Sequence, residues 1–268
     1  MYLYNSLTRK KEELTEKKIR MYVCGVTVYD RPHLGHALST VTFDVLHRYL
    51  EFIGHEVIRV QNFTDVDDKI IAKANELKIS PIEVAEKYIQ AFFQDMDELG
   101  VRRADVHPRA TEDMSEIINL IETLVHKNAA YETLGSVYFD INYDKGYGRL
   151  SRRKLNEMLE NTRTQSEPGK RNPADFALWK AAKPEEIHWQ SPWGLGRPGW
   201  HIECSAMVKK HLGDEIEIHG GGLDLIFPHH ENEITQSQSA NDNDLFSRFW
   251  IHNGLLKRSG DEKMSKSL

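Results

Sequence analysis

The sequence is poor in cysteine and contains no long apolar run. Its two cysteines, Cys24 and Cys204, are too few and too far apart to indicate a disulfide framework. We therefore expect both thiols to be reduced, as is usual in a cytoplasmic protein. A membrane-spanning helix needs about 18 consecutive apolar residues, and the sequence has no such run. Residues Met1–Arg20 lack the apolar centre of a signal peptide, so we expect no membrane association.

The sequence also lacks an excess of positive charge. Its 268 residues carry a formal net charge of −6, which gives no overall attraction to nucleic acid but is compatible with a local basic patch. A chain of this length fits one large domain or two smaller ones, and it can bury a core without disulfides. Histidine, in contrast, is abundant, with 13 residues.

Apolar segments and helical patterns alternate in the first part of the chain. Ile19–Tyr29 is β-branched and apolar, as in a strand buried on both faces, and a helical pattern then runs to about Ile53. Val57–Phe63 predicts the next strand, and Asp67–Leu77 and Pro81–Leu99 predict two helices. This alternation predicts a parallel sheet, and the glycine-containing turn after the first strand is typical of an anion site.

The pattern changes after Ala110. Thr111–Lys127 predicts an amphipathic helix and Ser136–Ile141 a strand, and a loop-rich charged stretch, 142–173, follows. We interpret about 113–195 as an insertion without a parallel-sheet pattern. The alternation then resumes in these segments: a strand at Glu215–His219, a glycine loop at Gly220–Asp224, a helix that carries His229, and a strand at Phe249–Asn253.

The polar segment Pro228–Glu233 has the residues expected of a metal site. It begins with a proline suited to a helix start, and on a helix His229 and Glu233 share a face and can bind one ion. Two ligands are too few for stable zinc binding, but Cys24 and Cys204 would complete a four-ligand set. The alternative is that the cysteines fill the core and the histidines lie on a solvated helix face.

Several motifs resemble those of known synthetases. Two of them, His33–His36 (HLGH) and Lys263–Ser267 (KMSKS), are similar to the signatures of class I aminoacyl-tRNA synthetases. Four further segments resemble the cysteinyl-tRNA synthetases: Met21–Gly25 (MYVCG), Asn62–Asp65 (NFTD), Pro198–Ser205 (PGWHIECS) and Phe227–Glu233 (FPHHENE). The resemblance covers nearly all of the chain.

The resemblance implies an α/β fold with a Rossmann-type parallel sheet, helices on both faces and a connective insertion. The catalytic domain would consist of two halves, 1–112 and 196–268, separated by the insertion 113–195. The family continues beyond the KMSKS motif into stem-contact and anticodon-binding regions. The chain is therefore expected to be the catalytic part.

The resemblance also implies one zinc ion per chain, held by Cys24, Cys204, His229 and Glu233. Spacing alone leaves His230 open as a ligand, and the family position favours His229. An apolar pocket separates cysteine from serine by roughly 100-fold or less. Because a thiolate is a far better zinc ligand than an alcohol, we expect the sulfur of the substrate to bind the ion.

The implied reaction is ATP-dependent activation of L-cysteine to cysteinyl-adenylate, followed by transfer to tRNA(Cys). Such a step needs the phosphate oxygens to be positioned and their charge neutralised, which suits imidazoles at a helix N-terminus, lysines, and Mg²⁺ bound with ATP. The residues that match catalytic positions of the family are His33, His36 and Lys266. Those that match its ATP-binding positions are His33, Gly35, His36, Gly221, Asp224, Lys263 and Lys266.

The substrate pocket of the family matches Gly25, Thr64 and Trp200. On the sequence alone, Trp200 fits a place in the core equally well. The expected partners are L-cysteine, ATP and tRNA(Cys), and we expect a monomer.

Two other functions stay open. Cysteine ligases of the mycothiol pathway share these motifs but transfer cysteine to an amino-sugar. A truncated, non-catalytic paralogue would bind cysteine or zinc without catalysing the reaction.

Overall fold

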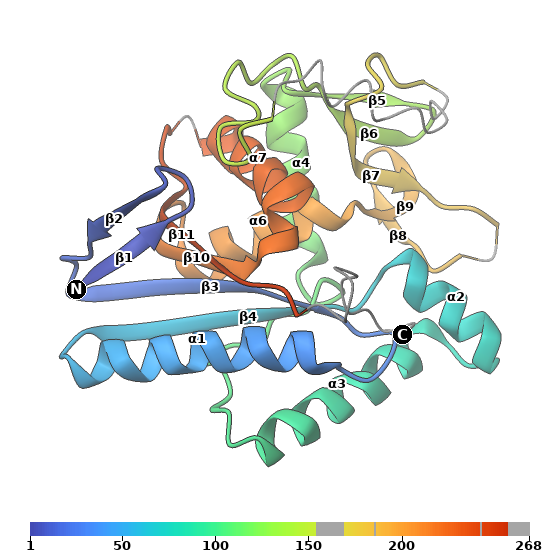
Figure 1. Cartoon of the computed structure of the whole chain (residues 1–268). Coiled ribbons are helices and arrows are strands. Elements are labelled where there is room, and N and C mark those ends of the chain that lie inside the picture. The colour runs from blue at the N-terminus through green and yellow to red at the C-terminus, as the bar shows by residue number, and fades with distance from the viewer. Residues whose placement is uncertain (154–168, 185, 242, 257–268) are drawn as a thin grey trace. The chain divides into compact units, whose positions relative to one another are not determined.

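The computed structural model describes residues 1–153, 169–184, 186–241 and 243–256 (Figure 1). The described chain forms two compact units. The first comprises Met1–Glu112, Glu215–Leu225 and the described part of Ser247–Leu268, and the second comprises the described parts of Asp113–Asp214 and Ile226–Phe246. The domain ranges 1–112, 113–195 and 196–268 concern the architecture of the family and stay a prediction.

The first unit is built on a four-stranded parallel sheet with the strand order β11-β10-β3-β4. The strands are β3 (Lys18–Thr27), β4 (Glu56–Thr64), β10 (Ile216–Gly222) and β11 (Ser247–Asn253). Each of them overlaps a strand expected from the sequence, so the predicted parallel α/β sheet is confirmed. Strands of such sheets are buried on both faces, which explains the continuous apolar character of β3.

Three helices of the first unit begin at local sequence signals. They are α1 (Leu34–Phe52), α2 (Asp68–Leu77) and α3 (Pro81–Glu98). The Ser80 hydroxyl accepts the Glu83 N–H, and the Glu83 carboxylate accepts the Ser80 N–H, which caps α3 in both directions. At α2 the cap runs in one direction, since the Asp67 carboxylate accepts the Lys69 N–H at 2.9 Å.

Apolar side chains fix the helices on the sheet. Phe43 and Leu50 of α1 pack with Met21 and Val23 of β3 in one cluster, and all four are at most 1% exposed. A second cluster joins α2 and α3 to Phe63 near the end of β4. The helix that follows β3 is thereby held against the sheet along its length.

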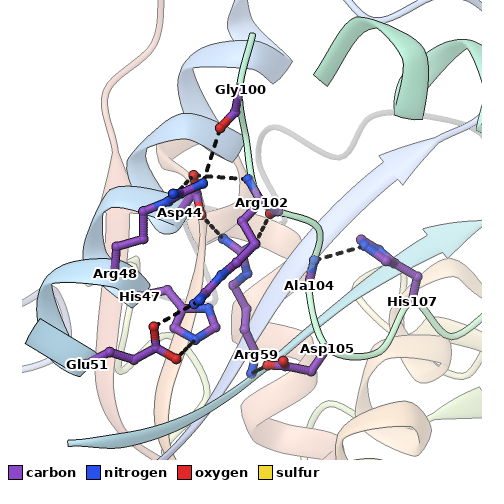
Figure 2. A network of polar contacts seen from close by, with 10 residues as sticks. All are labelled: Asp44, His47, Arg48, Glu51, Arg59, Gly100, Arg102, Ala104, Asp105 and His107. Atoms are coloured by element: carbon purple, nitrogen blue, oxygen red, sulfur yellow. Dashed lines mark hydrogen bonds and ion pairs between the residues drawn. The ribbon is translucent and has the colours of Figure 1, made fainter. Parts of the chain in front are cut away.

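A buried polar network also ties the second half of α1 to β4 (Figure 2). The guanidinium of Arg59 in β4 is 1% exposed and donates to the Arg102 carbonyl, and the Arg59 backbone N–H donates to Asp105 at 2.7 Å. Asp44 of α1 accepts the Arg102 N–H at 3.2 Å. Burial, together with the nearby guanidinium groups of Arg102 and Arg59, lowers the pKa of His47.

A short antiparallel hairpin precedes the sheet. It consists of β1 (Tyr2–Asn5) and β2 (Lys10–Glu13), which the sequence did not predict. Its strands are short and mostly exposed, so they lack the apolar run that marks β3.

The second unit contains an antiparallel sheet in the order β5-β6-β7-β9-β8. Its strands are β5 (Ala130–Thr133), β6 (Ser136–Phe139), β7 (Phe176–Ala181), β8 (Trp189–Ser191) and β9 (Gly194–Pro198). Its helices are α4 (Met114–His126), α6 (Trp200–Leu212) and α7 (Glu231–Asn241). The helix and strand predicted near the start of the insertion, now α4 and β6, are confirmed, whereas the strands β5, β7, β8 and β9 and the helix α6 were not predicted.

The helical path near His229 begins after a break at Phe227, whose backbone is extended (φ −141°, ψ 132°). The proline at position 228 was expected to begin this helix, and it is the first residue after the break. His229 lies in the short turn η2 (Ile226–His230), and α7 follows from Glu231. The other short turn, η1 (Leu223–Leu225), follows β10 in the first unit. Among the described helices, none has the length and apolar character needed to cross a membrane.

Candidate functional site

The candidate residues of the first unit lie at the carboxyl edge of the parallel sheet. In open parallel sheets, ligands bind at this edge where the strand order reverses. The chain passes from β3 to β4 on one side, whereas β10 and β11 lie on the other side of β3. The reversal therefore falls between β3 and β10.

Cys24 and Gly25 form an irregularity in β3. The pairing register between β3 and β4 shifts between Val23 and Val26, and Cys24 is 7% exposed. The Gly25 N–H donates to Asn62 Oδ1 at 2.8 Å. A Cβ atom on Gly25 would lie 1.6 Å from the Asn62 carbonyl oxygen, so this position requires glycine for packing.

His33, Gly35 and His36 form the start of α1. His33 Nδ1 accepts the Gly35 N–H at 3.0 Å, and His36 Nδ1 accepts the His33 N–H at 3.1 Å. The two rings stack with centroids 3.9 Å apart. Because both Nδ1 atoms are acceptors, the hydrogen of each neutral ring is on Nε2, and both rings can act as Nε2–H donors.

Thr64 is the last residue of β4 and is 2% exposed. The next side chain, Asp65, accepts the Thr111 hydroxyl at 2.5 Å and the Thr111 N–H at 3.1 Å. Burial raises the pKa of Asp65, although both hydrogen bonds from Thr111 oppose this effect. These contacts fix the backbone next to Thr64.

The glycine loop after β10 is closely packed. A Cβ atom on Gly220 would lie 2.2 Å from the Phe43 ring, and one on Gly222 would lie 2.5 Å from Asp224 Oδ1. Gly221 is buried between them, and Asp224 is exposed in η1. The predicted ATP-binding residues Lys263 and Lys266 lie outside the described residues.

Three predicted metal ligands meet inside the second unit. Cys204 comes from α6, His229 from η2 and Glu233 from α7, and each is at most 1% exposed. One ligand atom from each lies within 4.8 Å of the others. His229 Nε2 is 3.1 Å from Glu233 Oε1, so the expected one-turn spacing brings these two side chains together.

The other nitrogen of His229 faces a second histidine. His229 Nδ1 and His201 Nδ1 are 2.9 Å apart, and the Trp200 ring stacks on His229 with centroids 4.2 Å apart. Burial, with a smaller effect from Lys180, lowers the pKa of His201 to about 3, so this imidazole is neutral. If His229 binds an ion through Nε2, its Nδ1 must carry the hydrogen, and His201 accepts it. Trp200 is 38% exposed, which places it at the edge of the core rather than inside it.

The three side chains fit a zinc ion chemically. A thiolate, an imidazole nitrogen and a carboxylate are ligands that zinc accepts together. A fully buried carboxylate such as Glu233 is costly without a compensating cation or hydrogen bonds, which favours a cation at this position. The fourth predicted ligand, Cys24, belongs to the first unit and is not disulfide-bonded.

The sequence did not reveal the polar support of α7. Residues 144–151, predicted only as part of a loop, donate to and accept from polar side chains of α7. A signal was present, because α7 has no apolar stripe, and a buried helix of this kind needs polar partners.

Comparison with known proteins identifies the family. Residues 10–268 match the family described as "tRNA synthetases class I (C) catalytic domain". The chain is 55% identical over 269 residues to the cysteine--tRNA ligase of Thermococcus gammatolerans, covering 99% of this chain and 56% of that protein. It is 54% identical over 271 residues to the enzyme of Carboxydothermus hydrogenoformans, covering 100% of this chain and 58% of that protein. The chain thus spans little more than half the length of these relatives.

The fold also matches solved synthetase structures. The methionyl-tRNA synthetase of Mycobacterium tuberculosis in complex with methionyl-adenylate aligns with a TM-score of 0.67 and 14% identity. The alignment covers 94% of this chain and 60% of that chain, and at this identity it shows the fold alone. The resemblance to cysteinyl-tRNA synthetases is confirmed, and the chain belongs to the class I tRNA synthetase (C) catalytic domain family.

Proposed function

We propose that the whole protein is a cysteine--tRNA ligase. Its first step joins the carboxylate of L-cysteine to the α-phosphorus of ATP and releases pyrophosphate. In the second step a hydroxyl at the tRNA 3′ end attacks the carbonyl carbon, and AMP leaves. The observation that carries the proposal is the buried set Cys204, His229 and Glu233, in a chain whose relatives at 53–55% identity are cysteine--tRNA ligases.

We infer that one zinc ion binds Cys204, His229 and Glu233, with Cys24 as the fourth ligand by its match to the family. When bound, the ion would supply a soft Lewis acid that prefers the substrate thiolate to a serine hydroxyl. An apolar pocket alone would separate the two substrates by roughly 100-fold or less. His201 would support the site by accepting the Nδ1–H of His229.

The residues at the start of α1 are suited to the phosphates of ATP. His33 and His36 would donate from Nε2 to phosphate oxygens, because backbone N–H groups occupy both Nδ1 atoms. The helix N-terminus adds a partial positive charge at the same place. Gly35 cannot carry a Cβ, which would lie 2.7 Å from the His33 ring. Mg²⁺ would accompany ATP and neutralise further phosphate charge.

The remaining roles follow the match to the family. Gly25, Thr64 and Trp200 would contact cysteine, Gly221 would bind ATP, and Asp224 would bind the ribose of ATP. Lys263 and Lys266 would neutralise the leaving phosphates as point charges, with Lys266 acting in catalysis. We further propose a cytoplasmic, monomeric protein with tRNA(Cys) as its macromolecular partner.

Cysteine-dependent exchange of pyrophosphate into ATP tests the proposal on the whole protein, with serine as the control substrate. Exchange with cysteine, together with an ester formed on tRNA, is the expected result. Exchange without an ester on tRNA would favour transfer to an amino-sugar. Absence of exchange would favour a non-catalytic paralogue.

A further inference from the structure

α7 buries polar side chains where most helices bury apolar ones. Its residues Glu231, Asn232, Glu233, Thr235 and Gln236 are each at most 2% exposed. Such groups are tolerated when hydrogen bonds within the protein replace those to water. The partners of these side chains therefore decide how α7 is placed, and with it the ligand Glu233.

Several of these partners come from one segment, residues 144–151, which we call the supporting loop. The carboxylate of Glu231 accepts the Ser151 N–H at 2.8 Å and the Leu150 N–H at 3.3 Å. Hydrogen bonds to an ionised carboxylate are among the stronger ones in proteins. Both oxygens of Glu231 are thereby engaged by backbone of the supporting loop.

Two further contacts extend the attachment along α7. The Tyr147 hydroxyl donates to Asn232 Oδ1 at 2.6 Å, and the Thr235 hydroxyl donates to Asp144 Oδ2 at 2.6 Å. Burial, and then the carboxylates of Glu231 and Asp144, raise the pKa of Tyr147, so its hydroxyl keeps the proton that it donates.

The anchored residues lie between two metal ligands in the chain. Glu231 and Asn232 are two of the three residues between His229 in the turn η2 and Glu233 in α7. Their side chains bond to the supporting loop, whereas His229 and Glu233 face each other across 3.1 Å. The path of the backbone between the two ligands is therefore fixed from outside the metal site.

We propose that the supporting loop positions the metal ligands, with Tyr147 of the loop and Glu231 of α7 as the positioning residues. The inference rests on the proposed zinc site and adds two residues that do not touch the ion. Glu231 has a second effect, since its own carboxylate has the chemistry of a ligand. The backbone amides commit that carboxylate to the supporting loop, and Glu233 is left to bind the ion.

The test measures zinc affinity of the whole protein by competition with a chelator, and the visible absorption of its Co²⁺ form. In Tyr147→Phe the ring stays and only the hydroxyl is lost. Loss of a partner bonded directly to a ligand typically lowers metal affinity by about 10- to 100-fold. Because Tyr147 bonds to Asn232 and not to a ligand, we expect a loss of about 10-fold or less. The Co²⁺ absorption should also change, because the ligands are less well oriented. A purely structural role would lower the melting temperature of the metal-free protein without changing this spectrum.

A matched control variant removes the hydroxyl group of a different tyrosine. Tyr143 precedes the supporting loop and is 43% exposed, so Tyr143→Phe should leave both zinc affinity and the Co²⁺ spectrum unchanged. At the other positioning residue, Glu231→Gln keeps one acceptor oxygen for the backbone amides of the supporting loop and Glu231→Ala keeps none. The loss of affinity should therefore be smaller in the glutamine variant. If Tyr147→Phe does not fold, Thr235→Val tests the same attachment one turn further along α7.

The outcomes separate this inference from the proposed function. Unchanged affinity and an unchanged Co²⁺ spectrum in the folded variants, with zinc bound by the native protein, would overturn the positioning role and leave the proposed function standing. A native protein that binds no zinc would overturn both. Weaker affinity with an altered spectrum, in Tyr147→Phe but not in Tyr143→Phe, supports the inference.

Discussion

α1 and α7 both carry functional candidates at or just before their first turn, but they are held in opposite ways. α1 buries Phe43 and Leu50 in an apolar cluster, and its candidates His33 and His36 cap the helix themselves. α7 buries polar groups, and several of them bond to side chains or backbone of the supporting loop. Apolar burial is non-directional and proportional to area, whereas a buried polar group needs each of its hydrogen bonds. Apolar packing is thus the main support of α1, with the polar network around Asp44 beside it, whereas α7 relies more on individual hydrogen bonds.

The largest loss of stability is expected from removing a buried apolar side chain of α1. Phe43→Ala removes a ring that is 1% exposed and packs under Gly220. The variant should lose about 3–5 kcal/mol of unfolding free energy, because a cavity remains. Urea unfolding followed by circular dichroism measures the loss. A loss below about 1 kcal/mol would show that this region does not depend on apolar packing.

A smaller loss of stability is expected from removing buried hydrogen bonds of α7. Gln236 is fully buried, and its amide donates to the His201 carbonyl at 3.0 Å and to the Ser205 hydroxyl at 2.9 Å. Gln236→Leu has a similar volume but removes both of these hydrogen bonds, so we expect a loss of about 1–3 kcal/mol. The same unfolding assay measures it. Unchanged or increased stability would contradict the view that polar partners hold α7.

Acid should destabilise the first unit through His107. His107 accepts the Ala104 N–H through Nε2 at 3.1 Å (Figure 2). Its Nδ1 is 2.8 Å from the Gln61 carbonyl, so the neutral ring satisfies both groups. Burial lowers its pKa to about 4, with Arg59 and Arg103 acting in the same direction and the Gln61 carbonyl against it. The unfolded chain binds a proton near pH 6.5 and the folded chain only near pH 4, so stability is lost as pH falls through this window.

Between these two pH values, His107 changes the unfolding free energy by at most about 1.4 kcal/mol per pH unit. His107→Gln cannot take up the proton, and the dependence of its unfolding free energy on pH between these values should be flatter than in the native protein. If the plots of unfolding free energy against pH are parallel for the two proteins, His107 has the same pKa in the folded and unfolded chains.

Loss of a helix cap should have a smaller effect. Ser80→Ala removes the hydroxyl that accepts the Glu83 N–H at the start of α3, and about 1 kcal/mol should be lost. Ser80→Asp should restore most of it, because a carboxylate accepts the same hydrogen. Thermal unfolding of the three proteins measures the difference. Equal stability of the alanine and aspartate variants would refute the capping role.

The smallest effect is expected on the outer face of α1. Phe52 is 85% exposed, so Phe52→Ser should change the unfolding free energy by no more than about 0.5 kcal/mol. Together with Phe43→Ala, this variant separates the two faces of one helix. A loss above about 2 kcal/mol would mean that the outer face is buried in the protein in solution.

The same contrast explains what could be predicted from the sequence. β3 and α1 were predictable because an apolar strand, a glycine turn and a long helical pattern follow one another locally. The pairing of His229 with Glu233 was predictable from their spacing, although α7 begins only at Glu231. The contacts of Tyr147 with α7 were not predictable, because they join polar residues far apart in sequence and follow no periodicity. β7, β8 and β9 were missed because they are short and only partly apolar.

The central claim is that a metal held by Cys204, His229 and Glu233 recognises the sulfur of cysteine. Absorption of the Co²⁺-substituted whole protein in the thiolate charge-transfer region tests this most directly, with cysteine or serine added. We expect cysteine to increase this absorption, serine to leave it unchanged, and Cys204→Ser to lower it before any substrate is added. Equal responses to cysteine and serine in a protein that binds Co²⁺ would contradict the claim.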